Sequence, residues 1–179
     1  NDKSKILDLI PAEKDVDGFL AENVGNLLLG KPCTVACTPF GVLKMLESTG
    51  VQLAGKNAVV LGRSNIVGKP MAMLLLKANC TVTICHSKTK DLEKFCKMAD
   101  VIVCAVGKTD LVTDNMVKDG VVIIDVGINR NEQGKVCGDV TIQDKSKVSY
   151  MTPVPGGVGP MTITMLLRNT LTLFEENYL

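Results

Sequence analysis

The sequence predicts an α/β protein built on a doubly wound parallel sheet of the Rossmann-like kind. Short apolar runs alternate with segments of helical periodicity, which is typical of a parallel sheet covered by helices on both faces. The first apolar run is followed at once by Gly62 and then by a helical segment, as in a nucleotide-binding turn. We expect strands over residues 58–61, 81–85, 101–106 and 121–126, and helices over 70–77 and 92–98.

The flanking segments add further helices, whose ends are set by proline and glycine. We expect a helix over residues 4–10 that stops at Pro11, a charged loop over 13–18, a short apolar segment over 23–29, a helix from Thr38 to near Gly50, a short helix or turn over 111–117, and a long closing helix over 161–178.

The composition excludes several classes of protein. Hydrophobic residues make up 46% and charged residues 22%, an ordinary globular balance that argues against disorder. A net charge of +1 and 3% aromatic residues argue against a nucleic-acid partner. Apolar runs are too short for a membrane span, and no secretory signal opens the sequence. We therefore expect neither a nucleic acid nor a membrane as partner.

The seven cysteines predict reduced, mostly buried thiols in an intracellular protein. Their number is odd, no two have Cys-x-x-Cys spacing, and four of them lie in or beside apolar runs. His86 is the single histidine, so a zinc site or a histidine-based triad is not expected.

Residues 61–70 (Leu-Gly-Arg-Ser-Asn-Ile-Val-Gly-Lys-Pro) predict a phosphate-binding loop between a strand and a helix. Gly62 allows a sharp turn, Gly68 allows close packing of the helix, and amides at the helix start can face a phosphate. Ser64 replaces the middle glycine of the usual Gly-x-Gly-x-x-Gly pattern. The alternative is a tight strand-to-helix turn in another kind of α/β protein.

The end of the second strand favours NADP over NAD. An NAD site usually places a carboxylate there for the ribose hydroxyls. Residues 85–89 (Cys-His-Ser-Lys-Thr) contain none. Arg63 and Ser87 can donate to a 2′-phosphate, and Lys88 adds positive charge. The alternative for Ser87 and Lys88 is a solvated loop, and His86 by itself is more often structural.

Taken together, four segments resemble the bifunctional methylenetetrahydrofolate dehydrogenase/cyclohydrolase family, and the similarity runs from about Ile6 to the C-terminus. The segment Pro-Gly-Gly-Val-Gly-Pro at 155–160 is the most specific of the matching patterns. The matching segments are residues 14–18, 62–70, 86–89 and 152–162, and residues 37–39 and 125–129 also fit.

The resemblance implies oxidation of 5,10-methylenetetrahydrofolate with NADP and hydrolysis of the methenyl product to 10-formyltetrahydrofolate. It assigns cofactor contacts to Gly62, Arg63, Ser64, Ser87 and Ile128. It also implies that the folate cleft is lined by Pro155, Gly156, Gly157, Val158 and Gly159. Asp17 would hold the pterin, because a carboxylate can accept two hydrogens from an aminopyrimidine edge. The alternative for Asp17 is a surface helix cap.

One family feature does not occur in these residues. The catalytic lysine of the family lies in a Tyr-x-x-x-Lys motif upstream of residues 14–18, whereas neither Tyr150 nor Tyr178 begins such a motif. We therefore assign no catalytic residue within this chain. Because the first residue is Asn1 rather than Met, we expect a chain that begins partway through a longer protein.

Three readings remain open at this point. The chain is the C-terminal part of an enzyme, a non-catalytic NADP-binding module that pairs with another chain, or a different Rossmann dehydrogenase, against which residues 155–160 argue. By resemblance we expect residues 38–160 to be the NADP-binding domain, and residues 1–37 and 161–179 to be the remnant of a folate domain. We also expect a homodimer in the cytoplasm, with the mitochondrion as the alternative compartment.

Overall fold

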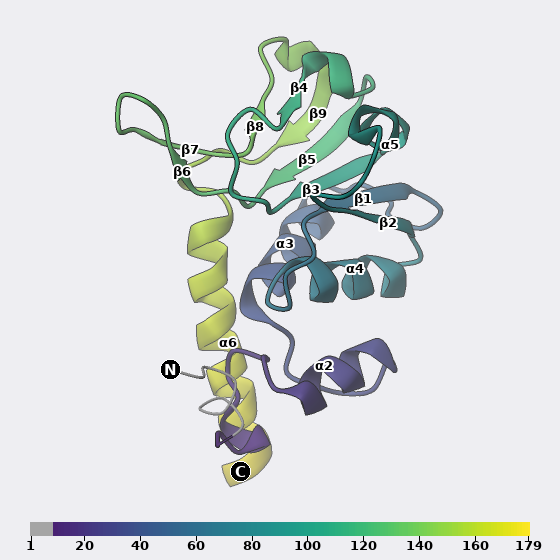
Figure 1. Cartoon of the computed structure of the whole chain (residues 1–179). Coiled ribbons are helices and arrows are strands. Elements are labelled where there is room, and N and C mark those ends of the chain that lie inside the picture. The colour runs from purple at the N-terminus through teal and green to yellow at the C-terminus, as the bar shows by residue number, and fades with distance from the viewer. Residues whose placement is uncertain (1–8) are drawn as a thin grey trace.

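The computed structural model describes residues 9–179, and its centre is a five-stranded sheet of parallel strands (Figure 1). The doubly wound parallel sheet that the sequence predicts is confirmed. The strands in order across the sheet are β2 (Thr81–Cys85), β1 (Asn57–Leu61), β3 (Val101–Cys104), β5 (Val121–Asp125) and β9 (Val148–Met151).

The strand order reverses between β1 and β3, because the chain passes from β1 outward to β2 and then returns to the other side of β1. This is the flavodoxin-like variant of the doubly wound order, in which β2 is an edge strand. Ligands of such sheets bind outside the carboxyl ends of the strands, at the point of reversal.

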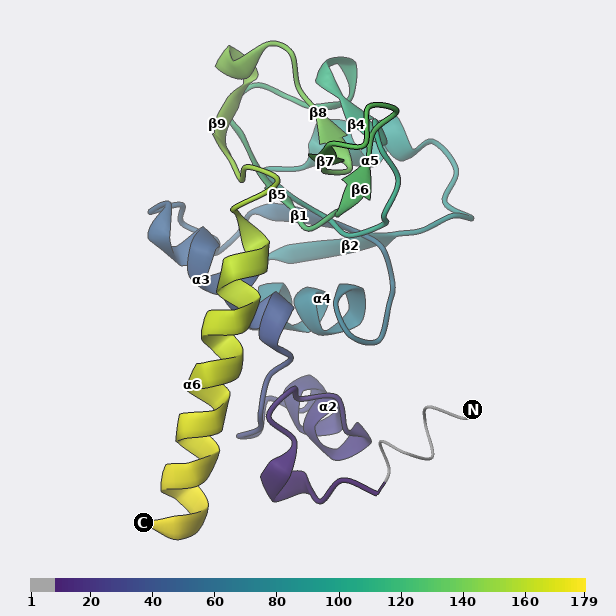
Figure 2. The ribbon, with the colours of Figure 1, turned by 90° about the vertical axis from the view of Figure 1, so that its left-hand side faces the viewer.

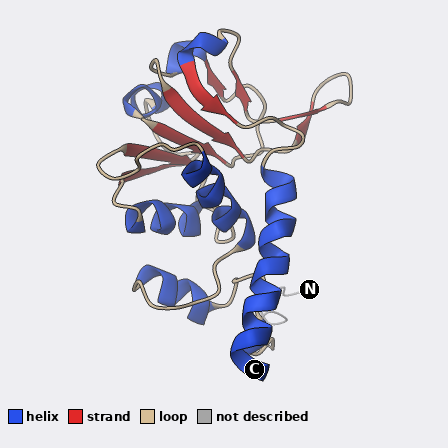
Figure 3. Ribbon diagram, turned by 180° about the vertical axis from the view of Figure 1, so that it is seen from behind, coloured by secondary structure: helices blue, strands red, loops and turns tan. Residues whose placement is uncertain are grey.

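Both faces of the sheet are covered, as continuous apolar strands require (Figure 3). On one face α3 (Cys37–Ser48) and α4 (Gly68–Lys77) pack on the strands, and on the other lies α5 (Leu92–Met98). Successive strand residues alternate between the faces. The first core contains Val60, Val103 and Ile124 with Leu46, Met71 and Leu75, and the second contains Val59, Ile102 and Ile123 with Cys96, Val112 and Val140.

The closing helix α6 (Val158–Tyr178) leaves the sheet, passes α3 and reaches the region of α2 (Ala21–Leu28) and the short η1 (Ala12–Lys14) (Figure 2). The hydroxyls of Thr38 and Thr162 are 2.9 Å apart where α3 and α6 begin. Further along, the Asn169 side-chain amide donates to the carbonyl oxygens of Val16 and Val35, each at 2.9 Å. These bonds tie the N-terminal segment to the long helix.

Four short strands and two further 3-10 turns lie outside the main sheet. The strands β4 and β8 pair in parallel, and β6 and β7 form an antiparallel hairpin that projects from the body (Figure 1). Their bounds are β4 Val112–Thr113, β6 Asn129–Arg130, β7 Val136–Cys137 and β8 Val140–Thr141, with the 3-10 turns η2 Asp114–Met116 and η3 Lys145–Lys147.

Several element predictions need correction. Helices α4 and α6 begin at Gly68 and Val158, before Pro70 and Pro160, because proline is tolerated in a first turn where its missing N–H is not needed. The short helix or turn expected over 111–117 is present as the 3-10 turn η2, but the strand β4 before it and the strand β9 were not predicted. Of the helix expected over 4–10, residues 4–8 lie outside the described residues, and Leu9 and Ile10 are not helical.

All seven cysteines are free thiols; five are buried, and Cys33 and Cys137 are half-buried. Burial raises the pKa of the Cys96 thiol to about 12, because an apolar environment disfavours the thiolate. Across residues 9–179, no helix combines the length and apolar character needed to cross a membrane.

Candidate functional site

The carboxyl ends of β2, β1 and β3 are joined by backbone hydrogen bonds at the switch point. The Gly62 N–H donates to the Cys85 carbonyl oxygen (2.9 Å), and the Ala105 N–H donates to the Leu61 carbonyl oxygen (2.8 Å). Gly62 has a φ of +115°, and a Cβ at this position would lie 2.5 Å from the Ala105 carbonyl oxygen. Glycine is therefore required for the turn itself and for the approach of the β1 and β3 loops.

Ser64 organises the loop between β1 and α4. Its hydroxyl oxygen accepts the N–H groups of Val67 (3.1 Å) and Gly68 (3.2 Å), and its carbonyl oxygen accepts the Lys69 N–H. The amides at the start of α4, which the sequence suggested would face a phosphate, are thus already bonded to Ser64. The exposed Ser64 hydroxyl keeps its hydrogen for donation to a ligand.

The β2 end forms a tight turn with Ser87 near its tip. The His86 N–H donates to the Thr89 hydroxyl (2.8 Å), and the His86 Nδ1 accepts the Lys88 N–H (3.1 Å). His86 therefore has the structural role that was expected of it. Ser87 and Arg63 are exposed, and no hydrogen bond or salt bridge within residues 9–179 uses either side chain. Both are available to a phosphate.

A largely apolar cleft of about 350 Å³ lies at the carboxyl edge beyond β5. Ile128 projects here with 73% of its surface exposed. The cleft brings Ile128 together with the loop between β9 and α6, namely Pro155, Gly156, Gly157, Val158 and Gly159, and with Thr38 and Thr162. Within that loop Gly157 and Val158 are buried, so Pro155, Gly156 and Gly159 form its exposed surface.

The predicted cofactor residues therefore fall into two groups along one edge. Gly62, Arg63, Ser64 and Ser87 follow β1 and β2, whereas Ile128 follows β5. From β2 to β5 is three strand spacings, or about 14 Å at about 4.8 Å each. This separation suits an extended dinucleotide that crosses the switch point.

Asp17 lies outside this cleft, on the segment before α2. Its neighbour Asp15 is buried and accepts the N–H groups of Phe19 and Leu20 and the side-chain amide of Asn23, at 2.8–3.1 Å. Helix α2 has Leu20 at its N-cap position and no side-chain cap, so Asp17 does not cap it, and Asp15 instead organises the turn that precedes the helix. Asp17 is exposed and stays next to Gly18, which packs against the backbone of Ala36 just before α3.

Two buried carboxylates that the sequence reading did not single out lie beneath the edge. Asp125 ends β5 and accepts the N–H groups of Gly127, Asp139 and Val140 at 2.9–3.0 Å. Asp139 in turn accepts bonds from the β3 loop and from Asn129. Burial raises the pKa of the Asp125 carboxyl, while the backbone N–H groups act in the opposite direction. For Asp125 the sequence did contain a signal, because a charged residue at the end of an otherwise apolar strand indicates a buried, hydrogen-bonded group.

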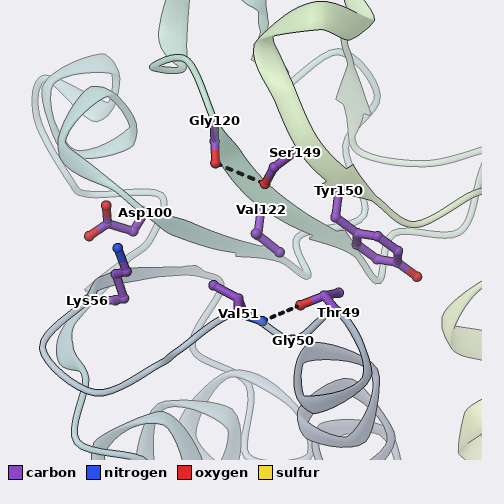
Figure 4. Close-up of a pocket in the computed structure, with 9 residues that line it drawn as sticks. All are labelled: Thr49, Gly50, Val51, Lys56, Asp100, Gly120, Val122, Ser149 and Tyr150. Carbon is purple, nitrogen blue, oxygen red and sulfur yellow. Dashed lines mark hydrogen bonds between the residues drawn. The ribbon is translucent and has the colours of Figure 1, made fainter.

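A second hollow, of about 320 Å³, lies at the opposite, amino edge of the sheet (Figure 4). Two of its polar side chains, Asp100 and Ser149, are already bonded within the protein. The Asp100 carboxylate accepts the Asn57 N–H and the Lys118 ammonium, and the Ser149 hydroxyl donates to the Gly120 carbonyl oxygen. None of the predicted site residues lines it. The carboxyl edge is thus the better candidate site.

No group of three or more His, Cys, Asp or Glu side chains within residues 9–179 has an arrangement that could hold a metal ion. The chemistry of the carboxyl edge rests on the amides, hydroxyls and cationic side chains described above.

Residues 36–178 match the family model described as the NAD(P)-binding domain of tetrahydrofolate dehydrogenase/cyclohydrolase. Among curated proteins, the bifunctional protein FolD of Polaromonas sp. is 61% identical over 176 residues, and that of Burkholderia multivorans is 60% identical. The matches cover 98% of this chain but 63% and 62% of those relatives, so the chain spans less than two thirds of their length.

Solved structures agree with this comparison. The bifunctional FolD of Campylobacter jejuni superposes with a TM-score of 0.93 at 52% identity, over 97% of this chain and 62% of that one. The Trypanosoma brucei enzyme, whose structure contains NADP and an inhibitor, has a TM-score of 0.91 at 41% identity, over 98% of this chain and 63% of that one. The chain belongs to the tetrahydrofolate dehydrogenase/cyclohydrolase family and contains the NAD(P)-binding domain of that family.

Proposed function

We propose that the protein oxidises 5,10-methylenetetrahydrofolate with NADP and hydrolyses the methenyl product to 10-formyltetrahydrofolate. The observation that carries the proposal is the arrangement of the carboxyl edge. Free phosphate-binding groups follow β1 and β2, and an apolar cleft with a glycine-rich wall lies beyond β5. A dinucleotide that crosses the switch point would bring its reactive end to that cleft.

Arg63, Ser64 and Ser87 are proposed to hold the adenosine half of NADP. Each presents a donor at the exposed edge, and neither residues 62–70 nor residues 86–90 contain a carboxylate that would repel a 2′-phosphate. Gly62 lets the backbone turn away beneath the ligand, and Ile128 offers an apolar surface to the nicotinamide half. When bound, NADP supplies the hydride acceptor, and the protein supplies orientation.

The folate is proposed to lie against Pro155, Gly156, Gly157, Val158 and Gly159, with Asp17 accepting hydrogen bonds from the pterin. Exposed glycines in this loop allow a flat ligand to approach the backbone closely. The exposure of the Asp17 carboxylate supports the assignment, because the nearby backbone N–H groups of Phe19 and Leu20 donate to Asp15 instead. By resemblance, the lysine that assists hydrolysis lies in a Tyr-x-x-x-Lys motif that these 179 residues do not contain.

A domain division is proposed with the same function. Residues 38–160 form the NADP-binding domain, and residues 1–37 and 161–179 belong with the folate domain. In support, α6 runs away from the sheet (Figure 2) and exposes a row of apolar side chains: Ile163, Leu167, Leu171 and Phe174. By resemblance the protein is further proposed to be a cytoplasmic homodimer.

The test is a calorimetric titration of the chain with NADP and with NAD, followed by assays of both reactions. Preferential binding of NADP supports the cofactor assignment, and equal affinities contradict it. Fast hydrolysis of methenyltetrahydrofolate is expected only from a polypeptide that also carries the Tyr-x-x-x-Lys motif. A chain that binds NADP but neither oxidises nor hydrolyses folate in any context is instead a binding module.

A further inference from the structure

Asp139 lies on the short segment between β7 and β8, directly beneath the carboxyl edge, and is fully buried. Its Oδ2 accepts the N–H groups of Val106 (2.7 Å) and Gly107 (3.0 Å), and its Oδ1 accepts the Lys108 N–H (2.8 Å). Three consecutive amides of the loop after β3 therefore converge on one carboxylate.

Such a run of amides is a nest of the kind that binds anions in nucleotide-binding proteins. Here the anion is a side chain of the protein itself, because Asp139 occupies the nest from below. In the described part of the chain Asp139 forms no salt bridge, so neutral donors alone compensate its charge. Asp139 thus fixes the conformation of the β3 loop before any ligand binds, and the amides of this loop are not available to a cofactor phosphate.

The same carboxylate also holds the loop after β5. The Asn129 side-chain amide donates to the Asp139 Oδ1 (2.8 Å), and Asn129 directly follows Ile128. Asp139 thus holds Val106 directly and Ile128 through its neighbour Asn129. Both apolar side chains lie at the edge, Val106 with 45% and Ile128 with 73% of its surface exposed. The Asp139 N–H donates to the Asp125 Oδ1 (3.0 Å), and this bond anchors Asp139 to the end of β5.

We propose that Asp139 is a positioning residue that sets the β3 and β5 loops in the arrangement that receives the nicotinamide half of NADP. This inference rests on the proposed function. The adenosine half would bind at the β1 and β2 ends, which Asp139 does not touch. Loss of the carboxylate should therefore weaken binding of the whole dinucleotide and spare binding of its adenosine part.

The experiment compares NADP with 2′,5′-ADP, which carries the 2′-phosphate but no nicotinamide, by calorimetry on the full chain. Asp139→Asn places an amide NH₂ against donor N–H groups. We expect about tenfold weaker NADP binding, because the loops must be ordered at the expense of binding energy. Binding of 2′,5′-ADP should stay unchanged, and hydrogen exchange should rise at residues 106–108.

The matched control is Asp114→Asn. The Asp114 carboxylate also accepts two loop amides, those of Gln143 and Asp144, but it lies on the η2 turn. This variant should bind both ligands normally. A merely structural role for Asp139 would lower the melting temperature of the variant but leave its NADP affinity, measured well below that temperature, unchanged.

Asn129→Ala keeps the test decisive if Asp139→Asn does not fold, because the carboxylate then retains its bonds to the β3 loop. We expect about threefold weaker NADP binding, because this variant loses less of the loop pre-organisation than Asp139→Asn does. Binding of 2′,5′-ADP should stay unchanged. Unchanged NADP affinity in the folded variants, or an equal loss for 2′,5′-ADP, overturns the proposal. If the unmodified chain binds neither ligand, the proposed function falls and this inference with it.

Discussion

Gly62→Ala is the sharpest test of the switch-point geometry. The new Cβ would sit on a residue with a φ of +115° and 2.5 Å from the Ala105 carbonyl oxygen. The unfavourable backbone conformation costs roughly 1–2 kcal/mol. The overlap with the β3 loop adds about 1–3 kcal/mol, the usual range for overpacking. The free energy of unfolding should therefore fall by about 2–5 kcal/mol.

Gly55→Ala is the matched control for this change. Gly55 also has a positive φ, +78°, but no atom lies within 4 Å of the Cβ that would be added. Only the backbone cost applies, so its loss should stay near about 1–2 kcal/mol. The excess loss in Gly62→Ala then reports the contact between the β1 and β3 loops together with the less favourable φ of Gly62.

Urea denaturation followed by circular dichroism measures both variants, and calorimetry measures their NADP affinity. At about 2–4 °C per kcal/mol for a chain of this size, Gly62→Ala should melt roughly 4–20 °C below the unmodified protein. It should also bind NADP less tightly, since Ala105 must move. If Gly62→Ala is no less stable than Gly55→Ala, the close approach at the switch point is not a constraint, and the reasoning is wrong.

Four further outcomes are expected. Arg63→Ala should weaken NADP binding by about 1.5–3 kcal/mol, the scale of a hydrogen bond to a charged group, and NAD binding much less; equal losses in calorimetry would contradict the assignment. Asp17→Ala should weaken folate binding without loss of stability, whereas Asp15→Ala should destabilise the protein, and unchanged folate affinity would make Asp17 merely structural. The 179-residue polypeptide should bind NADP yet hydrolyse methenyltetrahydrofolate about 10²–10⁴-fold more slowly than one that carries the Tyr-x-x-x-Lys motif, and comparable rates would show that the lysine is dispensable. Backbone N–H groups of Gln143 and Asp144 lower the pKa of the Asp114 carboxyl, so its stabilising contribution is complete above the ordinary value of 3.8 and is lost as the pH falls through the lower folded value. Acid titration of Asp114→Asn should lack that component, and an unchanged titration would refute it.

Local pattern was sufficient for the strands and helices whose signal is contained in their own residues. β2 and α5 have the predicted bounds, because β-branched residues and an apolar helical face mark Thr81–Cys85 and Leu92–Met98 directly. The starts of α4 and α6 were misplaced for one common reason. A proline in the first turn of a helix looks in the sequence like the start of that helix.

Elements that depend on distant partners were not predicted. Val112 is in a strand because it pairs with Val140, and Val148–Met151 is a strand because it extends the sheet beside β5. Neither segment is long or regular enough to indicate its conformation alone, since strand pairing is a tertiary interaction.

The sequence by itself determined the doubly wound class, the glycine turn after β1 and NADP as the cofactor to expect, because each depends on residues that are neighbours in the chain. Only the tertiary structure decided which groups remain available to a ligand. It showed that the amides before α4 are bonded to Ser64, that Asp15 rather than Asp17 is buried, and that Asp139 fills the nest after β3. For Asp139 the physical reason is that its partners lie 31–33 residues away along the chain, where local sequence does not encode them. Ser64 and Asp15 bond amides only three to five residues away, and there the folded backbone decides which nearby side chain satisfies those amides.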